Sequence, residues 1–257
     1  MRIFVVKKNT LIRAAVFLLV VIGAIVYTQV AFHKAEPTTA EASVMPVCRV
    51  AATDKVVALT FDTAFGDTDY TAQIIKVLQE ENVPATFFVM GLWAQQNPDA
   101  VKAMAQGGFE VASHSMNHVK YTELSQSEML EDAADAAELI FDMTGYDTEL
   151  LRLPYGSFDT QTIMALQAQG YVPMKWSLDS KDWKGDSADQ IAKTVLNSVE
   201  SGDIIMFQNN EAATPEALAA IIQGLRDQGF TIVTVSDLLL GGEYYVDEDG
   251  TQRVIAN

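Results

Sequence analysis

The stretch Val56-Val57-Ala58-Leu59-Thr60-Phe61-Asp62 is an apolar run that ends in a single carboxylate. A short, continuous apolar run of this kind predicts a strand that is buried on both faces, as in a parallel sheet. A segment with the spacing of an amphipathic helix follows at 71–81. The chain therefore enters its folded body as a strand and then a helix, and the same alternation repeats along the rest of the sequence.

Six further apolar runs predict strands at 85–90, 110–112, 150–153, 171–177, 204–207 and 231–235. Seven strands that alternate with helices indicate an α/β fold with a parallel sheet. A barrel of seven strand–helix units fits this count better than a doubly wound sheet. No Gly-x-Gly-x-x-Gly follows any of the strands, so a dinucleotide site has no support.

Capping signals mark where the helices between these strands begin. Ser125-x-x-Glu128 is a capping box that opens a helix to Thr144, and Gly145 ends it. Asn97-Pro98 and Thr214-Pro215 are predicted N-caps, and Ser236 is predicted to cap a last short helix. The remaining helices are expected at 160–169 and 187–199.

Composition and charge exclude several classes of protein. The chain has 257 residues, of which 49% are hydrophobic and 20% charged, so a disordered chain is excluded. Residues 36–257 carry 12 Lys and Arg against 34 Asp and Glu, a net charge of −22, which argues against binding of DNA or RNA. The single cysteine, Cys48, excludes an internal disulfide and a cysteine-based zinc site.

The N-terminus has the pattern of a membrane-targeting segment. Arg2, Lys7, Lys8 and Arg13 precede an apolar run at 14–27 that resumes through Phe32. We expect residues 1–32 to be an uncleaved signal anchor in the cell membrane, with the body on the extracytoplasmic side. A cleaved signal, and hence a secreted protein, is the alternative. Residues 33–53 are predicted to be a stalk, 54–240 the domain, and 241–257 a loosely packed polar tail.

Polar residues gather where the predicted strands end. In parallel α/β folds these C-terminal ends meet at one side of the sheet, and functional side chains collect there. Polar stretches lie at five of the seven ends: Asp62, 113–118, 152–156, 179–183 and 208–210.

Two of the three histidines, His114 and His118, lie in the predicted domain, and the third is His33. On a helical turn their spacing would place both imidazoles on one face, where they could chelate a cation; an ordinary pair of core or surface histidines is the alternative. Asp62 could be a general base or the cap of the next helix. Arg152 could be solvated at its strand end, or could pair with Asp62 and orient it.

Trp183 fits a core position or the wall of a ligand site. A serine hydrolase has no support, because no Gly-x-Ser-x-Gly is present.

Four stretches in this order resemble the polysaccharide deacetylases of the NodB-homology type, carbohydrate esterase family 4. They are Thr60-Phe61-Asp62, His114-Ser115-x-x-His118, Arg152-x-Pro154-Tyr155-Gly156 and Asp179-x-x-Asp182-Trp183. The resemblance covers about residues 55–240 and is greatest to membrane-anchored or secreted deacetylase-like proteins of spore-forming bacteria. It implies a distorted (β/α)7 barrel.

The resemblance also implies a role for each matching residue. Asp62 would be the base that takes a proton from water, with Arg152 orienting it. His114 and His118 would hold a divalent metal, usually zinc. The backbone N–H of Tyr155 would bind the oxyanion, and Trp183 and Met206 would wall the acetyl methyl group.

Two positions depart from the family pattern. The third metal ligand is usually an Asp directly after the base, but Thr63 stands here, so we expect weak metal binding; Asp67 or Asp69 could substitute. The sixth strand usually ends in Leu-x-His, whose histidine is the general acid, but Gln208 stands here and cannot titrate. Asp182, which would support that histidine, is then expected to bond to Gln208.

Three functions follow as hypotheses from these features. The first is a slow, metal-dependent N-deacetylase acting on peptidoglycan or another N-acetylglucosamine-containing glycan. The second is an inactive relative that binds glycan in the same groove, and the third is a metal-free structural barrel. We expect a monomer.

Overall fold

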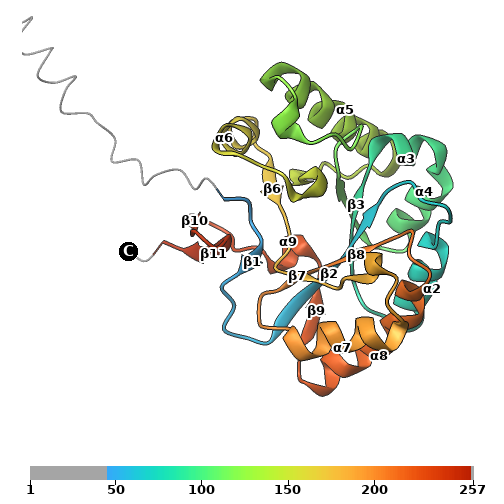
Figure 1. The fold of residues 1–257 in the computed structure, drawn as a ribbon. Helices are drawn as coiled ribbons and strands as arrows, with labels where there is room; N and C mark the ends of the chain where they lie inside the picture. Colours follow the sequence, from blue (N-terminus) through green and yellow to red (C-terminus); the bar gives the residue numbers. More distant parts are fainter. Residues whose placement is uncertain (1–44, 256–257) are drawn as a thin grey trace, which may run out of the picture. The chain divides into compact units, whose positions relative to one another are not determined.

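The computed structural model describes residues 45–255, in which helices surround a curled parallel sheet (Figure 1). The predicted signal anchor, residues 1–32, and most of the predicted stalk lie outside these described residues. Among the described helices, none has the length and apolar composition that a membrane crossing requires. Membrane anchoring therefore stays a prediction.

The main sheet runs in the order β6-β5-β4-β3-β2-β8-β7, and β9 pairs with the first half of β2. Every pairing in it is parallel, as helical crossovers between strands require. The seven-unit α/β fold is therefore confirmed in its coarse form, but β6 and β7 are edges, so the sheet is a half-barrel. The strands are β2 (Val56–Thr63), β3 (Thr86–Val89), β4 (Glu110–Ser113), β5 (Leu150–Arg152), β6 (Val172–Met174), β7 (Leu178–Asp179), β8 (Ile204–Gln208) and β9 (Thr231–Val233).

The strand expected at 171–177 is wrong as a single element, because the chain divides it between the two edges of the sheet. Pro173 has no N–H to donate and is confined to an edge strand, β6. Val47 covers part of that edge by accepting a hydrogen bond from the N–H of Lys175 at 2.8 Å. The chain then crosses over, and Ser177 donates to Ile204 O at the start of the β7–β8 pairing.

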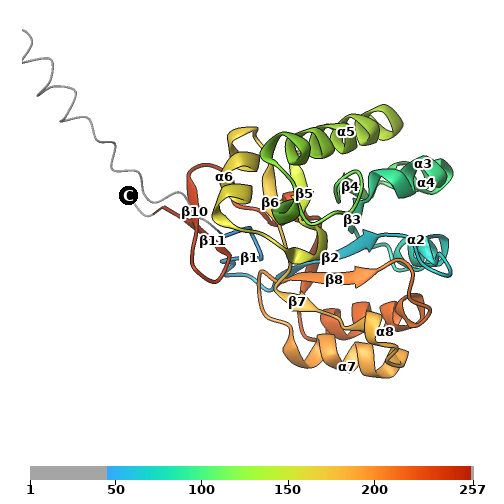
Figure 2. The same cartoon turned by 45° about the horizontal axis from the view of Figure 1, so that its top comes forward.

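The described helices pack their apolar stripes against the sheet and against one another. Helix α2, for example, buries Ile74 and Leu78. Both views place α7 beside α8 on one side of the sheet, and α5 on the far side from them (Figures 1 and 2). The helices are α2 (Thr71–Glu80), α3 (Gly91–Gln96), α4 (Pro98–Gln106), α5 (Gln126–Thr144), α6 (Thr160–Ala168), α7 (Ala188–Ser198), α8 (Ala213–Asp227) and α9 (Val235–Leu238).

The capping box of α5 is confirmed. Ser125 Oγ accepts the N–H of Glu128, and the Glu128 carboxylate accepts the N–H of Ser125 in return. Gly145 ends the helix at φ 76°, a conformation that glycine adopts without steric cost. This helix matters for the site described below because its buried stripe faces the turn after β4.

Of the three other predicted caps, one is confirmed in position and two are wrong. Asn97 is the N-cap of α4 and Pro98 is its first residue, although the Asn97 side chain makes no capping bond and donates to the carbonyl of Trp93 at 3.0 Å. Helix α8 begins at Ala213, so Thr214 lies inside its first turn. Helix α9 is capped by Thr234, two residues before Ser236, which lies inside the helix. For Asn97 and Thr214, another group takes the side chain: the carbonyl of Trp93 accepts from Asn97, and the Asp182 carboxylate accepts from Thr214.

Alternation along β2 sends its side chains to two different environments. Phe61 points into the layer between sheet and helices, where its ring stacks at 5.2 Å on Phe87 and 5.4 Å on Phe207. Thr60 and Asp62 point to the other, inner face of the curled sheet, where both contact Arg152. The inner face therefore carries buried polar groups that an apolar run alone does not reveal.

Residues 244–254 are not a loose tail. They form the antiparallel pair β10 (Tyr244–Val246) and β11 (Thr251–Val254), and β11 also pairs in parallel with β1 (Arg49–Val50). Gln252 is buried in this small sheet, and Cys48 donates its N–H to Gly250 O at 2.8 Å. The folded body thus includes residues that the sequence assigns to the stalk and to the tail.

Candidate active site

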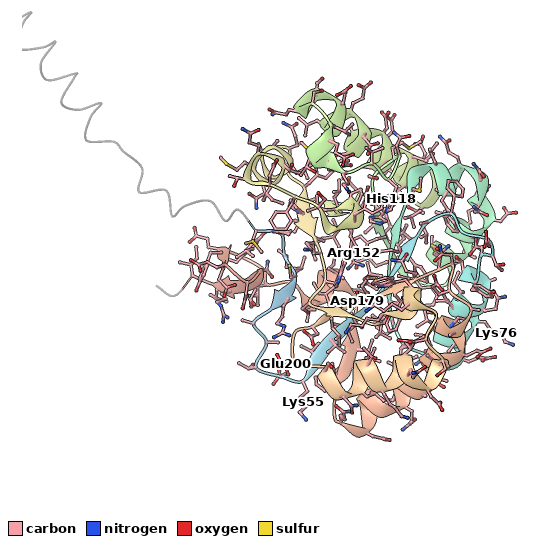
Figure 3. All side chains as sticks on the ribbon, viewed as in Figure 1. Lys55, Lys76, His118, Arg152, Asp179 and Glu200 are labelled. Carbon is pink, nitrogen blue, oxygen red and sulfur yellow. The ribbon has the colours of Figure 1, made fainter. Side chains whose placement is uncertain are left out.

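The ends of β2, β4, β5, β7 and β8 lie along one side of the half-barrel, as parallel strands require. His118 follows β4, Arg152 ends β5 and Asp179 ends β7, and Figure 3 labels all three. Asp62 on β2 lies directly opposite Gln208 on β8 in the strand register. The polar stretches that the sequence singles out therefore do meet at one place.

Asp62 and Arg152 form a buried ion pair. Arg152 Nη1 donates to Asp62 Oδ1 at 2.6 Å and to Thr60 Oγ1 at 2.8 Å, and Nη2 donates to Lys175 O at 3.1 Å. The guanidinium also lies 3.9 Å from the ring centroid of Phe88. Burial lowers the pKa of Arg152, and the Asp62 carboxylate opposes that shift. Of the two alternatives for Arg152, the structure has the pairing with Asp62.

The second carboxylate oxygen of Asp62 faces the histidines. Asp62 Oδ2 lies 3.8 Å from His114 Nε2. His114 Nδ1 lies 2.9 Å from the carbonyl oxygen of Arg152, which can only accept, so Nδ1 carries the proton and Nε2 has a free lone pair. The Nε2 atoms of His114 and His118 are 3.1 Å apart. The Nε2 atom of His114 thus faces both the free oxygen of Asp62 and the Nε2 atom of His118.

The two imidazoles do not lie on a helical turn as predicted. Residues 114–118 form an irregular turn in which Ser115 (φ 68°) and His118 (φ 53°) are left-handed. Burial lowers the pKa of His114, and burial followed by the charge of His114 lowers the pKa of His118 to about 4. Both rings are therefore neutral near pH 7, which is the form that binds metal ions.

The donor set fits a divalent cation with two protein nitrogens. Two Zn–N bonds of about 2.0–2.1 Å from one ion place their nitrogens roughly 3.3 Å apart, close to the separation of the two Nε2 atoms. Across residues 45–255, however, no group of three His, Cys, Asp or Glu side chains is arranged to hold a metal. Thr63 is fully buried, and its hydroxyl accepts the N–H of Met90 at 3.3 Å.

Neither acidic substitute for the third ligand has that role in the structure. Asp69 Oδ1 accepts the N–H of Thr71 at 2.8 Å and thereby holds the start of α2. It also accepts a bond from Asn209 Nδ2 at 3.3 Å. Asp67 is exposed in the same loop. Among the described residues, neither Asp67 nor Asp69 therefore forms a three-ligand group with the two histidines.

Asn209, which belongs to the polar stretch 208–210 but has no predicted role, fixes the loop after β2. Its side chain is completely buried, and its Oδ1 accepts the N–H of Ala64 at 3.0 Å. Its Nδ2 donates to Asp69 and to Thr71 Oγ1, and its N–H donates to Asp62 O. The end of β8 thus fixes the loop that carries Asp62. A buried amide among polar strand-end residues was the available signal.

Tyr155 lies at the rim of the site in a left-handed conformation, with φ 58°. Its ring is 63% exposed and lies 4.5 Å from the ring of His118. A non-glycine residue at positive φ is uncommon and is often found at functional sites. The backbone of the motif at 154–156 is therefore turned sharply beside the histidines.

The β7–β8 side of the site centres on Asp182, which is buried. Its Oδ2 accepts the N–H of Gln208 at 2.8 Å and the hydroxyl of Thr214 at 2.6 Å, and its Oδ1 accepts the N–H of Trp183 at 2.9 Å. Burial raises the pKa of Asp182 to about 6, against the opposing effect of these bonds. The expected contact with Gln208 therefore exists, but it is made by the backbone.

The side chains of Gln208, Met206 and Trp183 surround this carboxylate without bonding to it. Gln208 Nε2 contacts Met206 Sδ at 3.4 Å, and Met206 is buried. The Trp183 indole is 51% exposed, and its N–H lies 3.2 Å from the Asp179 carboxylate. Of the two alternatives for Trp183, a core position is wrong, and its exposed ring stands where it could wall a ligand.

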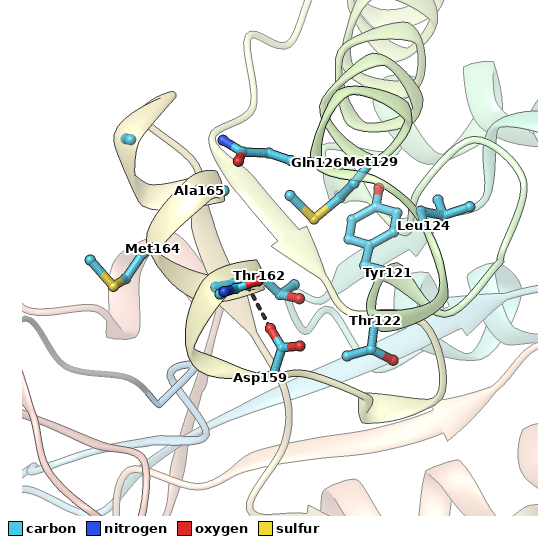
Figure 4. A pocket seen from close by; sticks show the side chains of 11 residues that line it. Tyr121, Thr122, Leu124, Gln126, Met129, Asp159, Thr162, Met164 and Ala165 are labelled. Atoms are coloured by element: carbon cyan, nitrogen blue, oxygen red, sulfur yellow. Dashed lines mark hydrogen bonds between the residues drawn. The ribbon is translucent and has the colours of Figure 1, made fainter.

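A separate pocket of about 520 Å³ lies between the turn at 121–124 and α6, away from Asp62 (Figure 4). Tyr121 and Met129 line it on one side and Ala165 and Met164 on the other, and the Asp159 carboxylate accepts the N–H of Thr162 at its edge. None of the predicted site residues lines this pocket.

Comparison with known proteins identifies related sequences. A family model described as polysaccharide deacetylase matches residues 49–174. A peptidoglycan-N-acetylglucosamine deacetylase of Bacillus cereus is 34% identical over 191 residues, covering 72% of this chain and 89% of the relative. The corresponding enzyme PgdA of Listeria monocytogenes is 32% identical over 214 residues, covering 82% of this chain and 45% of the relative. The chain thus spans about half of that relative's length.

Solved structures match as well. A CE4-family pseudoenzyme from Bacillus anthracis has a TM-score of 0.72 and 27% identity, covering 76% of this chain and 69% of that chain. A mutant of the same protein, described as having restored enzymatic activity, matches with the same TM-score and 28% identity, covering 76% of this chain and 71% of that chain.

Proposed function

The chain belongs to the polysaccharide deacetylase family, and we propose that it is a metal-dependent hydrolase that removes N-acetyl groups from peptidoglycan. The observation that carries the proposal is the convergence of Asp62, Arg152, His114 and His118, linked by contacts of 2.6–3.8 Å at the C-terminal ends of the strands. The names of the relatives support N-acetylglucosamine as the acetylated sugar.

Asp62 is the proposed general base. Arg152 holds Oδ1 and compensates the carboxylate charge in a buried environment, so Oδ2 is left to accept a proton from water. The 3.8 Å separation between Oδ2 and His114 Nε2 leaves the base beside the metal-binding nitrogens. The Oδ2 atom of Asp62, which accepts the proton, is thus held in one orientation before substrate binds.

Deacetylases of this family are metal-dependent. In this chain His114 and His118 would hold the ion, which we propose to be zinc. A bound divalent ion lowers the pKa of water and polarises a carbonyl group. The carbonyl of Arg152 fixes the His114 tautomer, so that Nε2 is the ligand atom.

The remaining groups position the N-acetyl group. The backbone N–H of Tyr155 would stabilise the oxyanion, since a donor aimed at developing charge contributes strongly to acyl transfer. Trp183 and Met206 would contact the acetyl methyl group, and the exposed face of Trp183 would lie against the sugar.

The protonation of the leaving amine is the weak step of this mechanism. Gln208 stands where the family has a histidine, and an amide does not donate a proton near neutral pH. Asp182 is buried and bonded to Thr214 and two backbone amides, so it does not replace that acid. General acid catalysis contributes about 10²–10⁴-fold, so the proposed enzyme is slow by about that factor.

An inactive, glycan-binding relative is the second candidate, and Gln208 and Thr63 favour it. The Bacillus anthracis structure is described as a pseudoenzyme, and its mutant as having restored activity. A protein of this fold can therefore lack activity, and substitutions can restore it. We also propose that the N-terminal segment anchors the protein in the cell membrane, with the folded body on the extracytoplasmic side. The protein would be a monomer.

Acetate release by the full chain in detergent tests these alternatives. The substrates are N-acetylglucosamine oligomers and peptidoglycan with added Zn²⁺ or Co²⁺, and the variants are Asp62→Ala and Gln208→His. Acetate release by wild type above the Asp62→Ala control supports the deacetylase. Release only by Gln208→His supports the inactive relative. No release by any of them, in the presence of bound metal, contradicts the proposed activity on these substrates.

A further inference from the structure

The turn that carries His114 and His118 depends on other elements of the fold for its stability. Ser115 and His118 both adopt left-handed backbone conformations, which residues with a Cβ atom rarely adopt. Within the turn, Ser115 Oγ accepts the N–H of His118 at 2.9 Å. One internal hydrogen bond leaves the remaining amides of the turn to be satisfied by other elements. The amides of His114 and Ser115 bond to β3 and β4, through Val89 O and Ser113 Oγ.

The amides of the next two residues, Met116 and Asn117, are satisfied by one carboxylate on α5. Asp132 Oδ1 accepts the N–H of Met116 at 2.9 Å and the hydroxyl of Tyr121 at 2.9 Å. Asp132 Oδ2 accepts the N–H of Asn117 at 3.1 Å and its side-chain Nδ2 at 2.7 Å. All four donors lie within residues 116–121, so the carboxylate bonds only to the segment around His118.

The burial of Asp132 makes this arrangement unusual. The residue is only 6% exposed, and among the described residues its hydrogen-bond donors are uncharged. A buried carboxylate without a cationic partner requires several well-placed donors, and the turn supplies them. Burial, and secondarily Asp132 itself, raise the pKa of Tyr121, so that hydroxyl stays a donor.

The opposite side of the turn is fixed by α3. The N–H groups of Gly91 and Leu92 donate to the carbonyls of Ser115 and Met116 at 2.9 and 3.0 Å. Helix α3 thus holds the carbonyls of Ser115 and Met116, while Asp132 holds the amides of Met116 and Asn117. Because the backbone of this turn is hydrogen-bonded on both sides, it has little freedom to move His118 away from His114.

We propose that Asp132 is a positioning residue that fixes the turn at 114–118, so that the Nε2 atoms of the two histidines converge for metal binding. It contacts neither imidazole and acts through the backbone of Met116 and Asn117. This role rests on the function proposed above, because convergence of two imidazoles serves a metal site. With only two protein nitrogens in that site, affinity depends strongly on their placement.

Two measurements on the full chain test this role. The first is the long-range ¹H–¹⁵N spectrum of the imidazoles without metal, which is simple because the chain has three histidines. The second is the Zn²⁺ dissociation constant by calorimetry. The variants are Asp132→Ala and Asp132→Asn, and the control is Ile140→Ala, which removes a buried side chain from the same helix.

We expect Asp132→Ala to shift the ring signals of His118 toward those of a free imidazole, to leave His114 on the Arg152 carbonyl, and to weaken Zn²⁺ binding at least tenfold. Ile140→Ala should lower the melting temperature while keeping the ring signals and the dissociation constant within twofold. Asp132→Asn, which keeps one acceptor oxygen, should lie between wild type and Asp132→Ala. It also keeps the proposal testable if Asp132→Ala does not fold.

Ring signals and Zn²⁺ affinity of Asp132→Asn and Asp132→Ala that match wild type would overturn the role of Asp132. If wild type itself binds no Zn²⁺, the metal site proposed above fails. The metal-free ring signals would still decide whether Asp132 positions His118.

Discussion

Asp62 on β2 and Gln208 on β8 are partners in strand register, yet the two sides of the site are built very differently. On the β2 side, a buried ion pair and two neutral imidazoles lie within about 4 Å of one another. On the β8 side, the buried carboxylate of Asp182 is bonded to backbone amides and a hydroxyl.

Hydrolysis of an amide needs a group that activates water and a group that protonates the leaving amine, and the two sides of the site differ in which of these they offer. The β2 side has the groups that bind a cation and accept a proton, and the β8 side lacks a group that donates one. Asp182 is held for packing of the β7 and β8 ends rather than for support of a titrating partner, because Gln208 offers it only a backbone N–H. The same fold can therefore keep the groups that bind a cation while it lacks the group that protonates the leaving amine.

The strongest test of the β2 side is Asp62→Asn. We expect acetate release to fall by about 10³-fold, because the amide cannot accept the proton. The variant should also lose about 3–5 kcal/mol of unfolding free energy, because Arg152 is left as an uncompensated buried charge. Acetate release and urea denaturation measure the two effects, with the exposed Asp67→Asn as control. Activity in a folded Asp62→Asn would mean that the base lies elsewhere.

The β8 side should respond in the opposite direction. Gln208→His restores a titrating group beside Asp182, and we expect kcat to rise by about 10²-fold. Gln208→Asn, which also lacks a titrating group, should leave the rate near that of wild type. The pH–rate profile of Gln208→His should gain a falling limb at high pH as the new imidazole loses its proton. Equal rates for the two variants would show that the missing acid is not what limits turnover.

The pKa of Asp182 provides a test of the same side without substrate. The folded-state pKa of about 6 lies above the ordinary value of 3.8, so between these values the folded state binds a proton that the unfolded state does not. The contribution of Asp182 to stability therefore falls as pH rises from about 4 to 6, by about 3 kcal/mol.

The depressed pKa of His118 acts in the opposite direction over about the same range, so the contribution of Asp182 must be isolated by difference. Asp182→Asn removes it, and the free energy of unfolding should then rise more steeply with pH than that of wild type. Urea denaturation at pH 4.5 and 7.0 gives both slopes. Parallel slopes would place the pKa of Asp182 near its ordinary value.

The sequence predicts much of this arrangement because the relevant signals are local. The run at 56–62 marks the central strand, and the four motifs are found at the strand ends where parallel topology brings them together. The pairing of strands that are far apart in the sequence is harder to predict. Nothing local to 171–177 indicates that Ser177 pairs with β8 while Pro173 stays on β6.

The details of the site depend on the same kind of distant contact. The spacing of His114 and His118 fits a helical turn as well as the left-handed turn that α3 and Asp132 impose. Asp69 is a candidate ligand in sequence but is engaged by Asn209, which lies 140 residues later. Asp132 itself was detectable, since it occupies the stripe of α5 that Met129, Ala136 and Ile140 otherwise keep apolar.

The smallest predicted effect is on Zn²⁺ affinity, and it tests how many metal ligands the β2 side has. Thr63→Val removes a hydroxyl that is engaged with the Met90 N–H, and we expect the Zn²⁺ dissociation constant to stay within about twofold. Thr63→Asp places a carboxylate next to the base, and we expect affinity to rise about tenfold, or about 1.4 kcal/mol. Calorimetric titration of both variants distinguishes the cases. A large loss of affinity in Thr63→Val would show that the hydroxyl is itself a ligand, and the β2 side would then hold a three-ligand site as it stands.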